Sequence, residues 1–331
     1  MASTYKKAGV NIDAGEEVVR RIKRSVRSTF TNNVLTDIGM FGAFYEAKFP
    51  GIKRPVLVSS VDGVGTKLKI AFALKRYDTV GQDLVNHCVN DIAVCGAVPL
   101  YFMDYFATGK LSPHIAADVI GGFAKACKEN HCSIIGGETA EMPGFYPAGE
   151  FDIAGTIVGV VDKSKIVNGK TIKKGDVLIG LPSAGVHTNG YSLARHVLLP
   201  KFSLKKKFDE LNGTLGDTLL AVHRSYLGPV KALTNKNLVK GMSHITGGGI
   251  IGNTMRIIPK GLSLKIDWFS WQRPFIYDLI QSTGQVPEYD MTRTFNLGVG
   301  LVVIADKKNV DVAMRLLKSK KEAPFVMGEV Y

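Results

Sequence analysis

Apolar side chains recur at helical spacing in two stretches of the N-terminal half. Between residues 14 and 28, Val18, Ile22 and Val26 lie on one face, which predicts a helix with one buried side. A helix is also expected from the Ser112 cap and Pro113 to about residue 128. Residues 82–95 carry the second apolar stripe, formed by Leu84, Val85, Cys88, Ile92 and Cys95.

The polar face of the 82–95 segment holds an acidic group at a fixed place. Asp83, His87 and Asp91 are four residues apart, and side chains at this spacing stack on a helix. Gly96 and Pro99 are expected to end the helix, so Asp91 lies one turn before a tight corner. This carboxylate could bind a metal ion or lie on a solvated helix face, and His87 is expected at the helix surface.

Shorter apolar runs bounded by glycine, proline and polar residues alternate with helical patterns along the whole chain. In the first half they predict strands at 55–61, which we expect to be buried, and at 100–106, 133–135 and 151–161. In the second half they predict strands at 177–181, 239–245, 262–266, 298–305 and 325–330. Helices are expected there at about 191–199, 216–233, 249–257, 274–282 and 310–318. The fold class is therefore mixed α/β.

A length of 331 residues fits two domains of ordinary size better than one small core. The polar, glycine-bearing segment at 168–176 separates two halves of different charge. Residues 1–165 carry 19 basic and 17 acidic side chains, whereas residues 166–331 carry 23 and 12. We expect a first domain at 1–165 and a second at 166–331.

The formal net charge of +13 suggests an anionic partner. Nucleic acid is one candidate, but the sequence has no zinc finger, RNP-like motif or aromatic-rich basic repeat. A phosphorylated small molecule would suit the same positive field. We therefore expect a small-molecule substrate and no nucleic acid.

Neither the membrane nor the secretory pathway is indicated. No apolar run approaches the ~20 residues of a membrane span, and residues 1–15 lack the apolar core of a signal peptide. The four cysteines form no Cys-x-x-Cys pair or zinc spacing; Cys127 and Cys132 could lie close together, but a reducing compartment is the simpler interpretation. A cytoplasmic location is expected.

Two motifs of the first half place carboxylates and glycines directly after strands. Residues 61–67 bring Asp62, two glycines, a threonine and Lys67 to a strand end, where they could bind a cation and phosphates or form a plain turn. Residues 136–144 repeat the arrangement, with Glu138 placed like Asp62. Asp62, Asp91 and Glu138 could form a hard-cation site, or they could be three unrelated surface carboxylates.

Two glycine-rich loops of the second half could bind an anionic substrate. His187 lies in the glycine-bracketed loop 183–192 and is the best placed of the seven histidines for acid–base chemistry or ligand binding. The loop 246–253 opens a helix, where free N–H groups form a natural phosphate site. His244 is expected to support that loop, and four further histidines are expected to be structural: His114, His131, His196 and His223.

These motifs, in this order, resemble the phosphoribosylformylglycinamidine cyclo-ligase family, the aminoimidazole ribonucleotide synthetases of purine biosynthesis. The resemblance covers nearly the whole chain, from residues 5–10 and 12–15 to residues 325–330. The other matching segments are 61–67, 91–99, 104–110, 136–144, 187–192, 246–249 and 293–296, with Trp271.

The resemblance implies an ATP-dependent ligase that closes the imidazole ring of formylglycinamidine ribonucleotide and releases ADP and phosphate. ATP would phosphorylate the formyl amide oxygen, a poor leaving group, and an amidine nitrogen would then attack the activated carbon. The family fold pairs two α/β domains, and the first domains of a homodimer join in a barrel-like sheet with ATP near the interface.

The resemblance also implies a role for individual residues. Asp62, Asp91 and Glu138 would bind Mg²⁺, and Lys23, Asp91 and His187 would be catalytic. The ATP site would comprise Asp62, Gly63, Gly65, Thr66, Lys67, Asp91, Gly136, Gly137 and Glu138. The ribonucleotide would be bound by Gly185, His187, Asn189, Thr246, Gly247 and Gly248.

Two other functions remain open at this point. Thiamine-monophosphate kinase belongs to the same superfamily, and ATP turnover without the amidine substrate would reveal a kinase of that kind. A basic nucleic-acid-binding module would instead show steep salt dependence of binding. The clustered carboxylates argue against the second, because they repel phosphates unless a cation intervenes.

Overall fold

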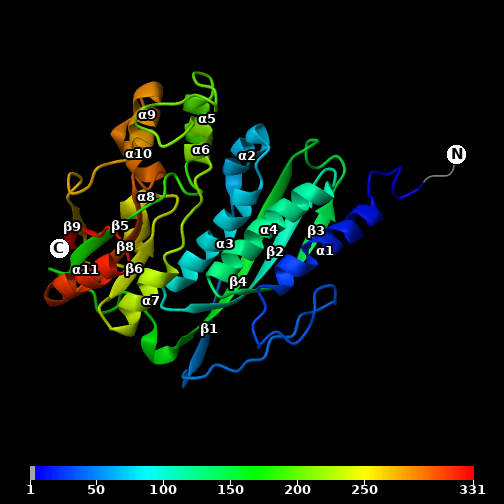
Figure 1. The fold of residues 1–331 in the computed structure, drawn as a ribbon. Helices are drawn as coiled ribbons and strands as arrows, with labels where there is room; N and C mark the ends of the chain where they lie inside the picture. The colour runs from blue at the N-terminus through cyan, green and yellow to red at the C-terminus, as the bar shows by residue number, and fades with distance from the viewer. Residues whose placement is uncertain (1–3) are drawn as a thin grey trace.

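The protein is described by a computed structural model that covers residues 4–331; residues 1–3 of the predicted first domain lie outside the described part. Two sheets with their helices lie side by side, with the N-terminus at one end of the molecule and the C-terminus at the other (Figure 1). Within the described residues, no helix combines the length and the apolar character needed to cross a membrane.

The first sheet has the strand order β1-β4-β2-β3. Its strands are β1 (Pro55–Gly63), β2 (Val98–Thr108), β3 (Ser133–Glu141) and β4 (Phe151–Asp162). Strand β4 runs antiparallel to β1 and β2, while β2 and β3 are parallel. One face is covered by α1 (Ile12–Arg27), α3 (Asp78–Ala93) and α4 (Pro113–Glu129) (Figure 1).

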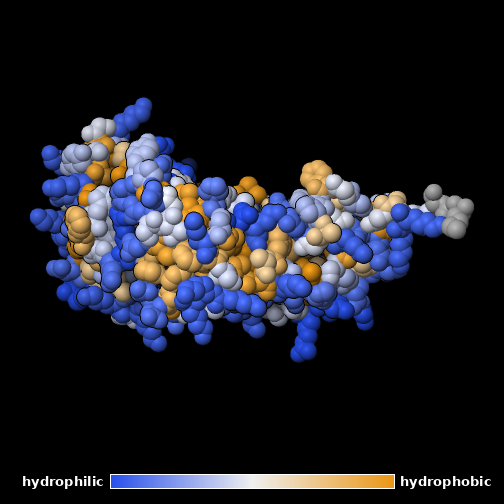
Figure 2. All heavy atoms as spheres, turned by 90° about the horizontal axis from the view of Figure 1, so that it is seen from above, coloured by the Kyte–Doolittle hydropathy of each residue, from blue (hydrophilic) through white to orange (hydrophobic). Residues whose placement is uncertain are grey.

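The other face of this sheet is exposed, which corrects one prediction. Residues 55–61 were expected to form a buried strand, but alternate residues of β1 point outward, and Leu57 and Val61 are 60% and 66% exposed. Met103 and Tyr105 of β2 are also exposed. Figure 2 shows hydrophobic residues open to the surface along the middle of the molecule. A run of apolar residues without strict alternation looks buried in the sequence, although one face of it lacks a cover within this chain.

The second sheet has the order β6-β8-β5-β9-β7, and all of its pairings are antiparallel. Its strands are β5 (Val177–Pro182), β6 (Gly241–His244), β7 (Leu264–Ile266), β8 (Val299–Ala305) and β9 (Phe325–Val330). Its helices are α5 (Tyr191–Leu198), α6 (Leu215–Leu219), α7 (Leu227–Asn235), α8 (Gly249–Thr254), α9 (Phe275–Gly284), α10 (Glu288–Thr294) and α11 (Val310–Ser319).

The predicted mixed α/β class is confirmed, and most elements lie where the pattern placed them. Two features differ. Strand β3 continues through Gly136 and Gly137 to Glu141, so these glycines do not form a loop. The short helices α2 (Leu68–Leu74) and α10 are absent from the predicted set. The barrel-like sheet expected across a homodimer involves two chains and stays a prediction.

A shared apolar core joins the two halves. It includes Phe102 and Ile157 from the first sheet and Ile179 and Leu181 from the second. A smaller core lies on the opposite face of the second sheet and includes Leu178, Val302 and Ile304. The contact between the halves is therefore continuous with the interior, and polar groups caught in it are held away from water.

Candidate active site between the two sheets

Helix α3 lies in the middle of the molecule, and almost all of it is buried (Figure 1). Its polar residues are covered by segments of the second half: Asn86 donates to the carbonyl of His223, and His87 contacts Thr188. The solvated-face alternative is therefore wrong for this helix. The expectation that His87 is a surface residue is also wrong, because that side chain is only 5% exposed.

Asp62 at the end of β1 and Asp91 on α3 form a pair of neighbouring carboxylates. Ser60 lies between them, with its hydroxyl 3.2 Å from Asp91 Oδ2 and 3.5 Å from Asp62 Oδ2. Burial, with a hydrogen bond and charge repulsion from Asp91, raises the pKa of Asp62 to about 7. Two like charges this close cannot both ionise freely, so the pair is short of positive charge.

Histidines surround this pair. His244 Nδ1 lies 2.7 Å from Asp91 Oδ1, while His87 Nε2 lies 3.5 Å from Asp62 Oδ1 and 3.9 Å from Asp91 Oδ2. Burial works to raise the pKa of Asp91, but the hydrogen bond and charge of His244 outweigh it and lower that pKa to about 2. Asp91 is therefore the ionised member of the pair and Asp62 the proton-holding one.

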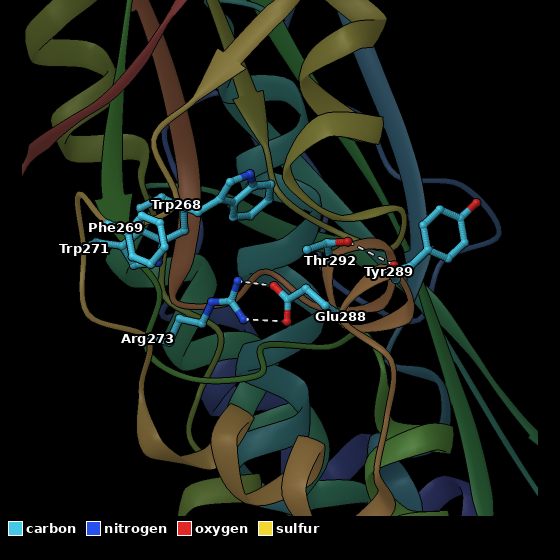
Figure 3. Close-up of a pocket in the computed structure, with 7 residues that line it drawn as sticks. All are labelled: Trp268, Phe269, Trp271, Arg273, Glu288, Tyr289 and Thr292. Atoms are coloured by element: carbon cyan, nitrogen blue, oxygen red, sulfur yellow. Dashed lines mark hydrogen bonds and ion pairs between the residues drawn. The ribbon is translucent and has the colours of Figure 1, made fainter.

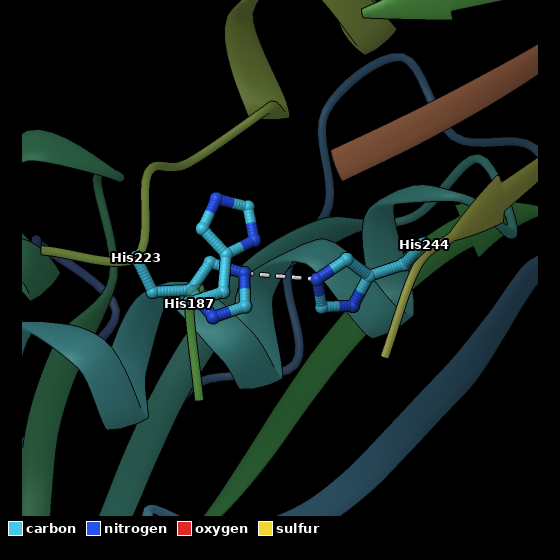
Figure 4. Close-up of side chains that lie close together, drawn as sticks. All are labelled: His187, His223 and His244. Carbon is cyan, nitrogen blue, oxygen red and sulfur yellow. Dashed lines mark hydrogen bonds between the residues drawn. The ribbon is translucent and has the colours of Figure 1, made fainter. Parts of the chain in front are cut away.

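His223 and His187 continue the cluster away from the carboxylates. His223 Nε2 lies 2.9 Å from His244 Nε2, and the rings of His187 and His223 stack with centroids 3.9 Å apart (Figure 4). His187, His223 and His244 are all at least 95% buried. Burial holds the pKa of His187 and of His223 well below the usual range, so both rings are neutral at pH 7.

The loop that carries His187 is tightly constrained. His187 has a φ of 62°, a left-handed conformation that costs energy in a residue with a side chain. Its Nε2 accepts from the N–H of Ala184 at 3.1 Å, which places the ring proton on Nδ1. That Nδ1 has no hydrogen-bond partner although it is buried. His187, which the resemblance makes a catalytic residue, thus carries an unsatisfied donor and is buried against the His223 ring in this conformation.

Lys67, a predicted phosphate ligand, lies elsewhere. Its ammonium group is 2.8 Å from Asp83 Oδ2, and both side chains are fully buried. It also donates to the carbonyl of Ala221 at 2.7 Å, while Asp83 accepts from the N–H of His223. Lys67 therefore joins the two halves, and its charge is already neutralised, so this conformation does not support contact with a phosphate.

The other residues of the predicted 62–67 motif lie at the same junction. Thr66 is exposed, and its hydroxyl is 3.0 Å from that of Ser192 at the start of α5. Gly63 and Gly65 are exposed, and Gly65 has a φ of 61°. The strand end at Asp62 and the His187 loop are thus side by side.

The two predicted substrate loops are neighbours. A Cβ on Gly247 would lie 3.2 Å from Asn189 Oδ1, and Gly247 and Gly248 are exposed. Thr246 donates to Asn253, and the N–H groups of Gly248 and Gly249 are already bonded to the carbonyls of Arg293 and Thr246. The loop is rigid, but it offers fewer free N–H donors than the sequence suggested. Gly185 is held by Asn296 and Tyr277, which both donate to its carbonyl.

A second group of predicted residues lies at the opposite edge of the first sheet. Asp62 and Gly137 occupy one row of that sheet, with Gly155 and Asp104 between them. Three strand spacings amount to about 14 Å. Glu138 and Gly136 are beside Gly137 on β3, so a single chain does not bring Glu138 to Asp62 and Asp91.

This second group lines a cavity of about 510 Å³ between β3, α1 and the 37–43 loop. Asp104 lies in its wall, and burial raises the pKa of that carboxyl to about 7. Lys23 of α1 is half-buried and pairs with Asp37 at 3.3 Å, and Arg27 also pairs with Asp37. The cavity is lined by Gly136, Gly137 and Glu138, with Val19 and Ile22 on the α1 side.

A separate hollow, of about 670 Å³, lies on the second half (Figure 3). Arg273 and Glu288 pair across it, and its aromatic wall includes Trp268 and Trp271. Thr292 is also part of it, and the Thr292 carbonyl is what a Cβ on Gly249 would strike. The hollow is therefore next to the 246–249 loop, although it includes none of the residues predicted for the site.

Sequence reasoning missed several members of the central site. His223 and His244 were assigned structural or loop-supporting roles, and Asp83 was placed on the polar face of its helix without a role of its own. His244 had a usable signal, because it directly precedes the 246–249 loop. For His223 the local sequence offered no such signal, since its neighbours in the site come from distant parts of the chain.

The residues present fit a divalent cation. Mg²⁺ prefers carboxylate oxygens, and Asp62 and Asp91 place such oxygens side by side with excess negative charge that a cation would relieve. Among the described residues, the groups that adjoin the pair are His87, His244 and the Ser60 hydroxyl, and no lysine or arginine is among them.

Comparisons with known proteins agree with this arrangement. Residues 51–161 match the N-terminal domain of the AIR synthase related proteins, and residues 173–331 match their C-terminal domain. In folded shape the chain is similar to thiamine-monophosphate kinase from Stenotrophomonas maltophilia, with a TM-score of 0.68 and 14% identity over 94% of this chain and 93% of that one. It is also similar to E. coli HypE, a hydrogenase maturation protein, with a TM-score of 0.67 and 15% identity over 95% and 90%.

Sequence relatives are much closer. The phosphoribosylformylglycinamidine cyclo-ligase of Thermoanaerobacter pseudethanolicus is 52% identical over 98% of this chain and 97% of its own length. The protein of the same name from Carboxydothermus hydrogenoformans is 51% identical over 99% and 96%. The chain therefore belongs to the phosphoribosylformylglycinamidine cyclo-ligase family.

Proposed function

We propose that this protein closes the imidazole ring of formylglycinamidine ribonucleotide at the expense of ATP, giving aminoimidazole ribonucleotide, ADP and phosphate. The observation that carries the proposal is the half-identical, full-length relationship to proteins with that name. The paired carboxylates at the junction of the two sheets add a physical reason, because phosphoryl transfer from ATP needs a bound cation.

Asp62 and Asp91 would hold Mg²⁺, which neutralises charge on the transferred phosphoryl group when bound. Asp91 is already ionised and fixed by His244, while Asp62 must release its proton to take part. The hydrogen bonds of Ser60 and His244 keep the Asp91 oxygens in place. Glu138 joins this set only if a partner chain supplies it, since within one chain it lies at the far edge of the sheet.

His187 would act at the reacting amide through the Nδ1–H that lacks a partner in this conformation. A neutral ring with a free donor can stabilise negative charge developing on an oxygen. Access requires the 183–190 loop to shift, and its strained φ at His187 stores energy that such a shift would release. Gly185, Asn189, Thr246, Gly247 and Gly248 would surround the ribonucleotide in the adjacent loops.

For the nucleotide, we propose the cavity beside β3, where Gly136, Gly137 and Glu138 meet α1. Lys23 and Arg27 provide positive charge there, at present paired with Asp37. A homodimer formed through the open face of the first sheet would cover Leu57, Val61, Met103 and Tyr105 and could bring this cavity to the carboxylate pair of the other copy. In this arrangement residues 1–165 serve ATP, metal and dimer contacts, and residues 166–331 serve the ribonucleotide.

The alternative is a kinase of the thiamine-monophosphate kinase type. The likeness to such an enzyme is at 14% identity and concerns the fold alone. The two functions differ in what ATP turnover requires, because a kinase transfers phosphate without closing a ring.

The test is to follow ADP release and aminoimidazole formation together, with Mg²⁺ and ATP, in the presence and absence of formylglycinamidine ribonucleotide. Ring closure with one ADP per imidazole, only when the ribonucleotide is present, is the expected result. ADP release with thiamine monophosphate and no ring closure would favour the kinase, and no ADP release with either substrate would contradict both.

A further inference from the structure

Four side chains and Asp91 form a continuous chain of hydrogen bonds that begins and ends on α3. His87 Nδ1 is 2.8 Å from Thr188 Oγ1, which is 3.2 Å from His223 Nδ1. His223 Nε2 is 2.9 Å from His244 Nε2, and His244 Nδ1 is 2.7 Å from Asp91 Oδ1. Between its two ends on one helix, the chain passes through three separate segments of the second half.

The carboxylate fixes the donor at one end of this chain. Asp91 can only accept, so His244 carries a proton on Nδ1 and donates it to Asp91. At the other end, His87 Nε2 faces Asp62 Oδ1, 3.5 Å away. The amide of Asn90, also on α3, lies 3.3 Å from His223 Nε2 and adds a side contact to the middle of the chain.

The histidines of this chain are almost fully buried: His87 and His244 are 5% exposed and His223 is 0% exposed. Hydrogen bonds in such surroundings strengthen one another, so the chain holds its members in one arrangement.

A metal ion shared by His187, His223 and His244 is a competing explanation, because their nitrogens lie within 4.8 Å of one another. The geometry argues against it. Two imidazole nitrogens bound to one tetrahedral Zn²⁺ lie about 3.3 Å apart, whereas the His223 and His244 nitrogens are at hydrogen-bond distance, 2.9 Å. The His187 and His223 rings are stacked with an interplanar angle of 16°, so their lone pairs do not converge on one point (Figure 4).

We infer that His244 is a positioning residue for the proposed cation site, and that the chain through His223 and Thr188 couples the 183–190 loop to Asp91. This inference rests on the proposed function. His244 occupies Oδ1 of Asp91 and leaves Oδ2, on the side of Ser60 and Asp62, for the cation. Thr188 is the residue after His187, so a shift of that loop would break the chain in its middle.

The decisive comparison is between His244→Asn and His244→Leu in the full-length protein. The asparagine amide N–H can replace the Nδ1–H donor to Asp91, whereas leucine fills space without donating. Binding of Mn²⁺, measured by electron paramagnetic resonance without nucleotide or turnover, is the readout. Loss of a partner that orients a metal ligand typically costs 10–100-fold in metal affinity, so His244→Leu should weaken Mn²⁺ binding at least about tenfold and His244→Asn less than about threefold.

His114→Leu is the matched control, because His114 is an exposed histidine on α4. Circular dichroism and thermal unfolding check that each variant is folded. Equal weakening in His244→Asn and His244→Leu, or none in His244→Leu, would overturn the positioning role. Zinc bound one per chain in the purified protein, and lost in His223→Leu, would overturn it in favour of a metal centre.

Coupling is tested by Thr188→Val, which removes the hydroxyl link while keeping a side chain of similar shape. In the unaltered protein, formylglycinamidine ribonucleotide should change the Mn²⁺ affinity by about fivefold or more, the lower end of common coupling strengths. In Thr188→Val that change should vanish, and its persistence would contradict the coupling. Since no readout requires turnover, a protein that binds Mn²⁺ as expected but closes no ring would refute the proposed function and leave this inference standing.

Discussion

Two aspartates on helix α3, eight residues apart, face opposite electrostatic circumstances. Asp83 is fully buried and pairs with Lys67, which brings an equal and opposite charge within 2.8 Å. Asp91 is partly open, lies beside a second carboxylate, and is hydrogen-bonded to Ser60 and His244 rather than to a lysine or arginine. Both hold the two halves together, through the N–H of His223 at Asp83 and through His244 at Asp91.

The difference shows how a structural acidic group can be told from a functional one. A buried carboxylate that pairs with a lysine of the protein already has its charge neutralised, so a bound cation would bring no further stabilisation there. A pair of carboxylates in which one raises the pKa of the other, with no lysine or arginine beside it, needs a cation to neutralise its charge. The same helix therefore carries a structural ion pair at Asp83 and a proposed cation site at Asp91.

The largest expected effect comes from breaking the ion pair of Lys67 and Asp83. Lys67→Met would leave Asp83 buried without a counter-charge, and such a loss typically costs about 3–5 kcal/mol of the free energy of unfolding. Urea unfolding followed by circular dichroism measures it. The double variant Lys67→Met/Asp83→Leu removes both charges and should recover most of the loss. If the free energy of unfolding of Lys67→Met lay within about 1 kcal/mol of that of the unaltered protein, the ion pair would not stabilise the fold as we describe.

The pair of Asp62 and Asp91 should respond in the opposite way, with a loss of activity and no loss of stability. Asp62→Asn removes a like charge, so the free energy of unfolding should stay the same or rise slightly. Ring closure should nevertheless slow by about 10²–10³-fold, the usual cost of losing a group that stabilises transition-state charge. Asp118→Asn, which removes an exposed carboxylate from α4, is the control. If Asp62→Asn destabilised the protein as much as Lys67→Met does, the distinction between a structural pair and a cation-binding pair would be contradicted.

The smallest effect is a dependence of cation binding on pH. The pKa of Asp62 is raised to about 7, so below that pH a cation must displace a proton. The apparent affinity for Mg²⁺ should therefore fall as the pH drops through 7, by up to about tenfold per pH unit. Titrations of Mg²⁺-dependent activity at pH 6, 7 and 8 measure this. In Asp62→Asn the slope should disappear, and a slope of the same size in that variant would assign the proton to another group.

The elements of α3 were predictable from the sequence, but its surroundings were not. The spacing of Leu84, Cys88 and Ile92 gave the helix and its buried stripe, because periodicity reports which residues share a face. It could not report that the second half covers the opposite face as well. The surface position predicted for His87 was wrong for this reason, and the burial of Asp83 was not foreseen.

For the site, the sequence identified the motifs that follow strands, but it did not identify the residues that contact them. Asp62 and Asp91 could be singled out because each lies at the end of a recognisable element. Lys67 stands in the same motif as Asp62, yet it turns into the interior, since the pairing with Asp83 depends on how two distant segments pack. Likewise Glu138 lies within a strand that the sequence predicted to end earlier, so its distance from Asp62 became evident only with the register of the sheet.

The most direct test of this contrast is the stoichiometry of Mn²⁺ binding to the unaltered protein, Asp91→Asn and Asp83→Asn, measured at pH 8 by electron paramagnetic resonance. The account predicts one site per chain in the unaltered protein, its loss in Asp91→Asn, and its retention in whatever fraction of Asp83→Asn remains folded. Retention of the site in Asp91→Asn would contradict the claim that the carboxylate without a protein counter-charge is the one that binds the cation.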